Sequence, residues 1–188
     1  AWPFVGPNSP LVLDMNGQYV YFFANLRDII WGDNSLLYSW SRALGGEFLG
    51  MYAYYLASPI SWIVVLFPED MITEAIWLML VLKTGICGLS MSFFLYKVYP
   101  SKSLNIVLFS TLYAFCAYNL AYMSNIMWMD GVMLLPLLIL GLESLLTDGK
   151  YKLYTLTLTL IILSNYYIGF MICIFVVLYM IHFHIAHD

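Results

Sequence analysis

The sequence predicts an all-α membrane protein that crosses the bilayer several times. Of its 188 residues, 63% are hydrophobic and only 10% are charged, and the mean hydropathy is +0.84. A soluble domain carries about 25% charged residues, which cover its wet surface. The hydrophobic residues also form long unbroken stretches, which are typical of membrane-spanning helices and not of the short alternating strands of a β-barrel. A soluble globular domain and a disordered chain are therefore excluded.

The charge and the cysteine content limit which partners and cofactors we expect for this protein. The formal net charge is −4, and the seven Lys and Arg residues are scattered along the chain. Because nucleic-acid binding needs a basic surface, we expect no nucleic-acid partner. The three cysteines, Cys87, Cys116 and Cys173, lie far apart in hydrophobic runs, which is typical of buried side chains and not of a disulfide framework or a zinc site. We expect no cofactor and name no metal ligands. A divalent metal stays an open alternative without support, since no Asp-x-Asp or His-rich spacing accompanies the candidate carboxylates.

Four hydrophobic stretches approach or exceed the roughly 20 residues that cross a bilayer. They are Ile72–Tyr96, Leu104–Tyr122, Ile126–Leu146 and Leu153–Ile181. The last is long enough for one tilted helix or for two half-helices broken near Ser164–Tyr167, and both interpretations stay open. We expect one transmembrane domain over residues 1–188, with about four to five transmembrane helices in residues 71–188.

The lysines of the connecting segments predict the orientation. Lys97 and Lys102 lie between the first two stretches, and Lys150 and Lys152 lie between the last two. Since cytoplasmic loops are rich in Lys and Arg, both connections are predicted to be cytoplasmic and residues 1–70 to form an extracytoplasmic loop. The chain starts at Ala1 without an initiator Met or a signal peptide, so we expect an N-terminal fragment of a longer protein.

The predicted outer loop has its own helical periodicity. Between Gly17 and Trp31 the hydrophobic side chains share one face, and the polar ones fall on another. The hydrophobic face comprises Tyr19, Phe22, Phe23, Leu26, Ile29 and Ile30, and the polar face comprises Gln18, Asn25 and Asp28. This pattern predicts an amphipathic helix in the membrane interface, and a second one is predicted over Ser35–Leu44. Pro59 interrupts the hydrophobic run that follows, so we expect no regular helix through it.

Six short motifs, in this order along the chain, resemble the YfhO family of bacterial membrane proteins. They are Asp14–Tyr19, Ser35–Trp40, Gly45–Gly46, Tyr54–Pro59, Asn125–Asp130 and Ser164–Gly169. The resemblance implies a C-type glycosyltransferase membrane fold in the bacterial cytoplasmic membrane. It also implies transfer of a sugar from an undecaprenyl-phosphate-linked donor to a cell-envelope polymer such as lipoteichoic acid, on the outer face.

Asp14 is the candidate catalytic residue. Sugar transfer from a lipid phosphate needs a base that takes the proton of the acceptor hydroxyl, and a carboxylate is the usual choice. Asp14 is predicted on the outer side, at the headgroup level where the lipid phosphate lies. In C-type enzymes, as the resemblance implies, an Asp after the first transmembrane helix is the base. The alternative is that Asp14 only caps the amphipathic helix. The neighbouring Asn16, Gln18 and Tyr19 are candidate substrate-binding residues.

Lys83, Asp130 and Arg42 are further substrate-binding candidates. Lys83 lies mid-span, where a charge costs about 2.5–3.5 kcal/mol, so it either binds the donor phosphate or pairs with an acid such as Glu74 or Asp130. Asp130 either orients the acceptor, positions Asp14 or helps to hold a metal, or it is a helix-end residue in contact with interfacial water. Arg42 either binds the lipid phosphate or is attracted to anionic headgroups.

Asn165 and Tyr166 complete the set of candidates. Asn165 is a polar break in a hydrophobic stretch and is a candidate to line a cavity. Tyr166 and Tyr167, like Tyr54 and Tyr55, offer flat faces to a sugar or polyprenyl unit, or they are interfacial belt residues.

A membrane glycosyltransferase that acts on lipid-linked sugars among membrane lipids is the leading hypothesis. A transporter or flippase for a lipid-linked substrate is the main alternative, with Lys83, Asp130 and Asn165 along its path. A non-catalytic membrane assembly subunit is the third, and it would tolerate loss of Asp14.

Overall fold

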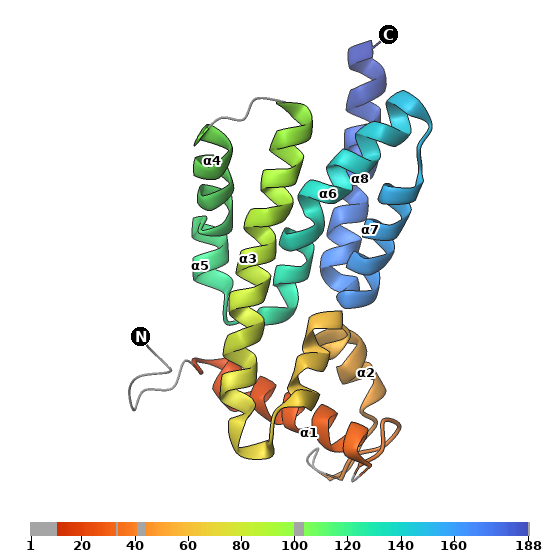
Figure 1. Ribbon diagram of the computed structural model, residues 1–188. Coiled ribbons are helices and arrows are strands. Elements are labelled where there is room, and N and C mark those ends of the chain that lie inside the picture. The colour runs from red at the N-terminus through yellow and green to blue at the C-terminus, as the bar shows by residue number, and fades with distance from the viewer. Residues whose placement is uncertain (1–10, 33, 41–43, 100–103, 188) are drawn as a thin grey trace.

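The computed structural model describes residues 11–187 except 33, 41–43 and 100–103, and this part of the chain is almost entirely helical. A bundle of long helices stands on a smaller group of short ones (Figure 1). We call the described residues between 11 and 71 the base. The base contains η1 (Met15–Tyr19), α1 (Val20–Trp31), α2 (Leu49–Met51), η2 (Tyr52–Leu56), η3 (Pro59–Leu66) and η4 (Glu69–Met71). The bundle contains α3 (Ile72–Val98), α4 (Leu104–Ala114), α5 (Ala117–Tyr122), η5 (Ile126–Trp128), α6 (Met129–Asp148), α7 (Lys152–Ser164) and α8 (Tyr166–His187).

Four segments of the bundle are long and apolar enough to cross a membrane, which confirms the predicted polytopic all-α class. They are Glu69–Val98, Leu104–Tyr122, Ile126–Asp148 and Tyr166–His187. The first three coincide closely with predicted stretches.

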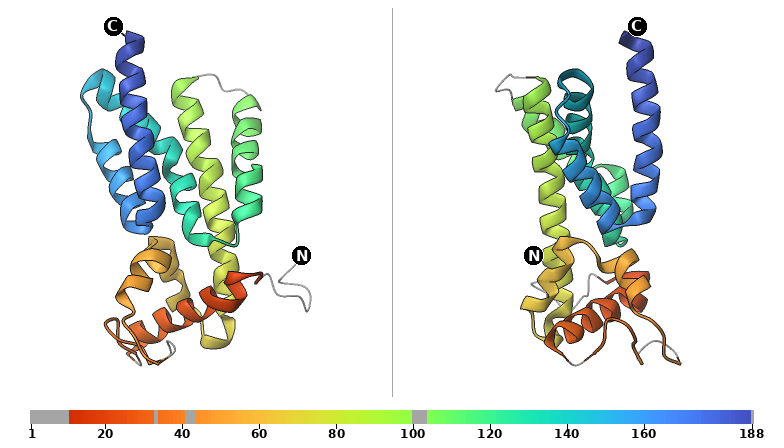
Figure 2. Two further views of the ribbon diagram at one scale, coloured as in Figure 1. Left: turned by 180° about the vertical axis from the view of Figure 1, so that it is seen from behind. Right: turned by 90° about the vertical axis from the view of Figure 1, so that its right-hand side faces the viewer.

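The fourth predicted stretch, Leu153–Ile181, is two helices that reverse direction. The backbone at Asn165 is extended, with φ −159° and ψ 108°, and α7 ends there. The Asn165 side-chain oxygen accepts a hydrogen bond from the backbone N–H of Ile168 at 2.9 Å, as an N-cap does, and α8 begins. Helix α8 then runs back beside α7, so its last turns lie toward the same end of the bundle as the α6–α7 connection (Figure 2). We call this the lysine end, since it carries Lys97 and Lys150.

Close packing of α6 on α7 depends on a glycine. A Cβ atom at Gly141 would lie 2.5 Å from the backbone nitrogen of Tyr154, which no side chain permits. Small residues allow membrane helices to approach closely, and the dispersion attraction between the two closely packed surfaces holds the helices together. Gly141 therefore sets the distance between α6 and α7.

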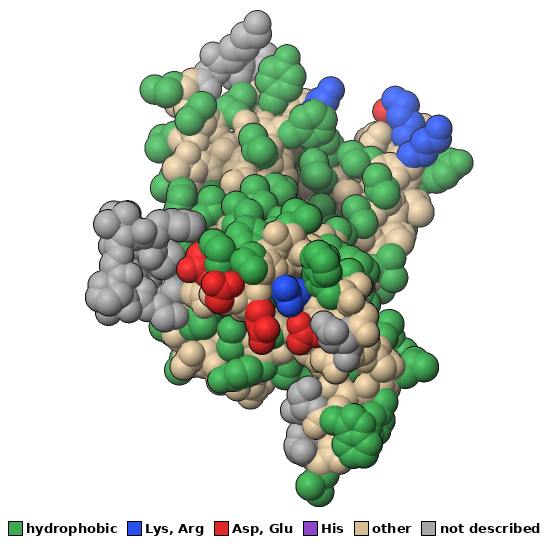
Figure 3. Space-filling view, turned by 60° about the horizontal axis from the view of Figure 1, so that its bottom comes forward, with side chains coloured by type: hydrophobic (Ala, Val, Ile, Leu, Met, Phe, Trp, Pro, Cys, Tyr) green, Lys and Arg blue, Asp and Glu red, His purple; other side chains and the backbone are tan. Residues whose placement is uncertain are grey.

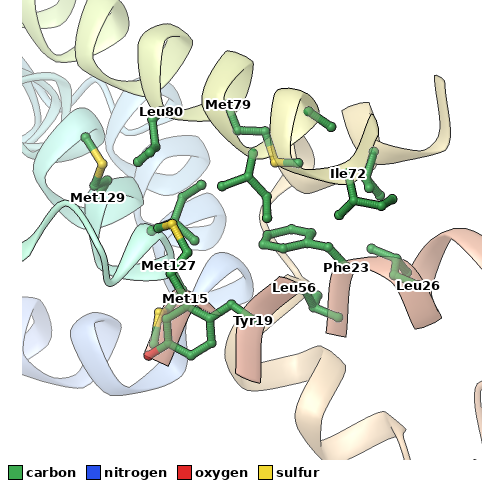
Figure 4. Close-up of a cluster of buried hydrophobic side chains, with 14 of the residues drawn as sticks. Met15, Tyr19, Phe23, Leu26, Leu56, Ile72, Met79, Leu80, Met127 and Met129 are labelled. Atoms are coloured by element: carbon green, nitrogen blue, oxygen red, sulfur yellow. The ribbon is translucent and has the colours of Figure 1, made fainter. Parts of the chain in front are cut away.

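The predicted amphipathic helix is confirmed as η1 and α1, which together lie across the foot of the bundle (Figures 1 and 2). Tyr19, Phe23 and Leu26 point into the main hydrophobic core, with Met79 of α3 and Met127 of η5 (Figure 4). The far end of α1 is tied to η3 and the residue that follows it, since Trp31 Nε1 donates to the Val65 carbonyl at 3.3 Å and Arg27 Nε to the Phe67 carbonyl at 2.8 Å.

The position of Asn25 differs from the one predicted for it on that helix. The periodicity places it on the polar, solvent-facing side, but its side chain is buried. Its Nδ2 donates to Ser39 Oγ at 3.1 Å, and its Oδ1 accepts from Asn34 Nδ2 at 3.0 Å. A buried amide needs such partners, and here the loop after α1 supplies them.

The second predicted amphipathic helix, over Ser35–Leu44, is wrong for the residues that the structure describes there. Residues 34–40 and 44–46 form turns around a bridge in which Ser39 and Gly46 exchange backbone hydrogen bonds of 2.8 and 3.0 Å. Gly45 has φ +94°, a left-handed conformation that glycine adopts without strain, and it turns the chain back onto Ser39.

The next helical unit of the base is bent at Ser58–Pro59. Segments Leu49–Leu56 and Pro59–Leu66 meet at 104°. Pro59 starts the second segment, where its missing N–H costs nothing, and Ser58 Oγ accepts a hydrogen bond from the Ile60 N–H at 3.3 Å. The predicted interruption at Pro59 is therefore confirmed.

The surface of the base mixes exposed apolar side chains with a few charged groups. Large apolar side chains are exposed on it, among them Leu13, Leu37, Trp40 and Leu66. Figure 3 shows a few acidic groups and one basic group on this face, surrounded by hydrophobic side chains. Such a mixture suits the boundary between headgroups and acyl chains.

Candidate functional site

Asp14 lies exposed at the first turn of η1. Its side chain makes no capping hydrogen bond to the helix that it precedes. The capping alternative is therefore not realised in this conformation. Asn16 and Gln18 are exposed on the same turn, while Met15 and Tyr19 point into the core. The motif thus divides into two groups. The solvent-facing group includes Asp14, the candidate catalytic residue, and the buried group holds the turn against the core.

Tyr19 is the anchor of this turn. Its ring is 4% exposed, and its hydroxyl donates to Asn125 Oδ1 at 3.0 Å. Burial, followed by the nearby charge of Asp14, raises the pKa of Tyr19 to about 12. The protonated hydroxyl holds η1 against the loop before η5. Tyr19 therefore fixes the position of the turn that carries Asp14.

A continuous row of aromatic rings runs from Tyr19 to the start of α8. Ring centroids are 5.3 Å apart for Tyr19 and Tyr55, 4.6 Å for Tyr55 and Tyr54, and 5.5 Å for Tyr54 and Tyr166. Tyr167 lies 6.5 Å from Tyr54. We call these five residues the aromatic row. Tilted and edge-on contacts at such distances hold rings in fixed orientations. Tyr166 and Tyr167 are exposed, so the row ends in open aromatic faces.

Asn165 joins the base to the bundle beside this row. It is 1% exposed, and its Nδ2 donates to the Tyr54 carbonyl at 2.8 Å while its Oδ1 caps α8. Both polar atoms are occupied within the chain. The structure therefore uses Asn165 to hold η2 against α8.

Lys83 and Asp130 form a buried ion pair, which realises the pairing alternative. Lys83 Nζ lies 2.6 Å from Asp130 Oδ2, and both side chains are 1% exposed. Lys83 also donates to the Ile126 carbonyl at 2.9 Å, and Ser58 Oγ donates to Asp130 Oδ1 at 2.7 Å. Each charge is neutralised and hydrogen-bonded, which burial requires. The pair ties α3, α6 and the bend of the base together.

Of the two arginines before residue 71, the structure describes Arg27. Arg42 lies outside the described residues. Arg27 is half-buried near the far end of α1, where Asp28 lies 3.2 Å from its guanidinium. It is 13 residues from Asp14, or about 20 Å along a helix, so it does not share the site of Asp14. Within the described ranges, no group of three or more His, Cys, Asp or Glu side chains is placed to hold a metal.

Four of the six motifs meet at one place. Tyr19 bonds Asn125 and contacts Tyr55, Ser58 bonds Asp130, and Asn165 bonds the Tyr54 carbonyl. These contacts join segments that lie up to 111 residues apart in the chain. The Ser35–Trp40 and Gly45–Gly46 motifs contribute the bridge between Ser39 and Gly46. Most of the motif residues thus build one connected unit around the base.

Comparison with known families agrees with that convergence. A family model described as bacterial membrane protein YfhO matches residues 2–187. The chain belongs to the YfhO family of bacterial membrane proteins. No curated protein and no solved structure matches the chain. In this YfhO chain the match includes every motif named above.

Two residues of the YfhO site are not among the candidates that the sequence indicates. Ser58 and Asn125 lie within the motifs, and the structure shows that they bond Asp130 and Tyr19. Ser before Pro is a helix-start signal, which was available for Ser58. Nothing local marks Asn125, because its partner Tyr19 is 106 residues away.

Proposed function

We propose that this YfhO protein is a glycosyltransferase that moves a sugar from a polyprenyl-phosphate-linked donor to a cell-envelope acceptor. The observation that carries the proposal is the uncapped, exposed carboxylate of Asp14, which lies near Tyr19 and Tyr55 at one end of an aromatic row whose other end is exposed. Aromatic faces pack against the apolar faces of sugars, and a carboxylate accepts a proton from an acceptor hydroxyl. Family membership is the second support.

The reaction is a displacement at the anomeric carbon. The acceptor hydroxyl gives its proton to Asp14, and its oxygen forms a bond to the anomeric carbon. The bond from that carbon to the phosphate oxygen breaks, and polyprenyl phosphate leaves with the electron pair. Asn16 and Gln18, exposed on the same turn, are candidate hydrogen-bonding groups for the sugar or the acceptor.

Orientation of the base toward the outside of the cytoplasmic membrane belongs to the same proposal. Lys97 and Lys150 lie at the opposite end of the bundle, and cytoplasmic loops are the basic ones. The base and Asp14 are then extracytoplasmic, at the headgroup level. A surface polymer such as lipoteichoic acid is the acceptor that the family resemblance implies.

The arrangement of the buried polar residues favours an enzyme over a transporter. A transport path would pass through Lys83, Asp130 and Asn165, but all three are 1% exposed and bonded within the chain. Opening such a path would break a buried ion pair, which costs about 3–5 kcal/mol.

The test uses the full-length protein, a polyprenyl-phosphate-linked sugar and purified lipoteichoic acid. Asp14→Asn is expected to lower the rate of polyprenyl phosphate release by at least about 10²-fold, the scale of general-base catalysis, and to leave folding unchanged. Asp70→Asn is the matched control, because Asp70 is also exposed on the base. Full activity of the Asp14 variant would refute the role of Asp14, and inactivity of the unmodified protein with every donor would refute the proposed reaction.

A further inference from the structure

A groove between α3 and the α4–α5 segment lies on the other side of α6 from α7 and α8 (Figure 1). One end of it, at Met123, is two residues from Asn125, the hydrogen-bond partner of Tyr19. Its volume is about 620 Å³. The wall on α3 includes Gly85 and Gly88, and the wall on α4–α5 includes Ala114 and Asn119. No charged side chain is among the described residues that line it. The groove is a mainly hydrocarbon surface within the spanning part of the molecule.

The groove exists because α3 carries small residues on this side. A Cβ atom at Gly88 would meet the Ala114 Cβ at 3.6 Å, so α3 and α4 pack closely there. A Cβ atom at Gly85 would meet nothing within 4 Å, so the wall is open one turn away. Close contact at one glycine and open space at the other leave a slot along the helix pair.

Asn119, one of the residues that line this slot, carries one unsatisfied acceptor. Its Nδ2 donates to the carbonyls of Tyr113 and Ala114, at 3.2 and 3.0 Å, and so caps the end of α4. Its Oδ1 has no hydrogen-bond partner in the described part of the chain, although the side chain is only 4% exposed. Flipping the amide would set the oxygen against two carbonyl oxygens, so the orientation is fixed. A buried acceptor without a donor is costly, and a ligand that brings a donor removes that cost.

We propose that the groove binds one neutral lipid of the diacylglycerol class, whose free hydroxyl donates to Asn119 Oδ1. A chain of hydrocarbon fits the slot between Gly85 and α4, and the acceptor requires a donor at its end. Asn119 lies on α5, the end of this span nearest the base, which is where the glycerol level of a bilayer falls if the base is interfacial. An anionic headgroup is disfavoured, because no described lining residue supplies a compensating charge. The site is therefore different from one for a polyprenyl phosphate.

The experiment compares two lipids that differ in one hydrogen-bond donor. Full-length protein in detergent is mixed with dioleoylglycerol or with its acetyl ester, and bound lipid is counted by native mass spectrometry. One dioleoylglycerol is expected per chain, with binding about tenfold tighter than that of the ester, the scale of one hydrogen bond to a buried acceptor. Equal binding of the two lipids by the unmodified protein would overturn the proposal.

Variants test the groove itself. Gly85→Leu fills the slot and is expected to abolish binding of both lipids, whereas Ala117→Leu, a matched change at an exposed position of α5, leaves it unchanged. Asn119→Leu is expected to bind the two lipids equally. If that variant fails to fold, the proposal is still tested by the comparison of the two lipids on the unmodified protein and by the Gly85→Leu variant.

Two other occupants are tested in parallel. Undecaprenyl phosphate is expected not to displace dioleoylglycerol, and displacement would assign the groove to an anionic polyprenyl lipid. A dimer that Gly85→Leu dissociates, without bound lipid, would assign the groove to a helix of a second copy. Either result would overturn the proposal.

Discussion

At the scale of single residues, the few charged groups of the bundle matter because the membrane gives them no water. Lys83 and Asp130 remain in the interior because each supplies the counter-charge of the other, and Ser58 and the Ile126 carbonyl provide further hydrogen bonds. Their types and depths were visible in the sequence, but their partnership was one of two open alternatives. Their distance of 47 residues along the chain explains why.

Removing one partner of this pair is expected to destabilise the protein more than removing both. Lys83→Met leaves the Asp130 carboxylate buried without its counter-charge and is expected to lower the free energy of unfolding by about 3–5 kcal/mol. Adding Asp130→Asn is expected to restore most of that loss. Unfolding in mixed micelles measures the free energy of unfolding of each variant. Lys97→Met, at the exposed lysine end, is the control. A double variant no more stable than Lys83→Met would contradict the ion-pair interpretation.

Tyr166 tests the aromatic row without disturbing the core, since its ring is 57% exposed. If its face packs against sugar, Tyr166→Ala is expected to raise KM several-fold, which corresponds to the roughly 0.5–1.5 kcal/mol of an aromatic contact. Tyr166→Phe keeps the ring and is expected to stay near the unmodified value. Tyr151→Ala, at the lysine end, is the control, and steady-state kinetics with varied donor gives the answer. An unchanged KM in Tyr166→Ala would make the residue an interfacial belt tyrosine.

At the scale of elements, hydrophobic length predicted where helices lie, and local chemistry decided where they stop. Leu104–Tyr122 and Ile126–Asp148 match their predicted bounds closely, because long apolar runs in lipid favour helices. The first of these spans is broken at residues 115–116, where α4 ends and α5 begins. The predicted helix over Ser35–Leu44 is wrong for the residues described there, because the backbone hydrogen bonds of Ser39 go to Gly46 and not to neighbours along a helix. Amphipathic periodicity over ten residues is too weak to exclude such a pairing.

The α7–α8 reversal depends on Asn165, and its two hydrogen bonds are separable. Asn165→Ser keeps a neutral side-chain oxygen to cap α8 but removes the donor to the Tyr54 carbonyl, whereas Asn165→Ala removes both. The expected order of stability is unmodified, then Ser, then Ala, with about 1 kcal/mol for the cap. Thermal unfolding measures the order, with Asn16→Ala on the exposed turn of η1 as the control. Equal stability of all three would show that Asn165 does not hold the hairpin.

At the scale of the whole molecule, the reversal decides which side of the membrane α8 reaches. If Leu153–Ile181 were one helix, its end would lie on the side of the base. With two antiparallel helices, the last turns of α8 lie with Lys150 instead (Figure 2). Hydropathy could not distinguish these arrangements, since both place the same apolar residues in lipid.

Cysteine labelling distinguishes the two topologies in intact cells. Native Cys87, Cys116 and Cys173 are first replaced by Ser, and a single cysteine is then introduced as Leu37→Cys on the base or as His184→Cys on α8. A membrane-impermeant maleimide is expected to label the first in intact cells and the second only after permeabilisation. Tyr151→Cys serves as the lysine-end reference. Labelling of position 184 in intact cells would contradict the antiparallel hairpin or the proposed orientation.

The sequence by itself was enough to show that this is a membrane protein, to place most of its spanning helices and to identify the motifs typical of its family. Those properties follow from local composition, because lipid accepts only long apolar helices whose backbone bonds are internal. Tertiary structure decided what the scarce polar residues do. Lys83, Asp130 and Asn165 are buried and bonded within the chain, and Asp14 is exposed beside the aromatic row. The side-chain oxygen of Asn119 is buried without a donor among the described residues. A polar group's role in a membrane protein depends on which partner reaches it, and partners more than a hundred residues apart are chosen by packing.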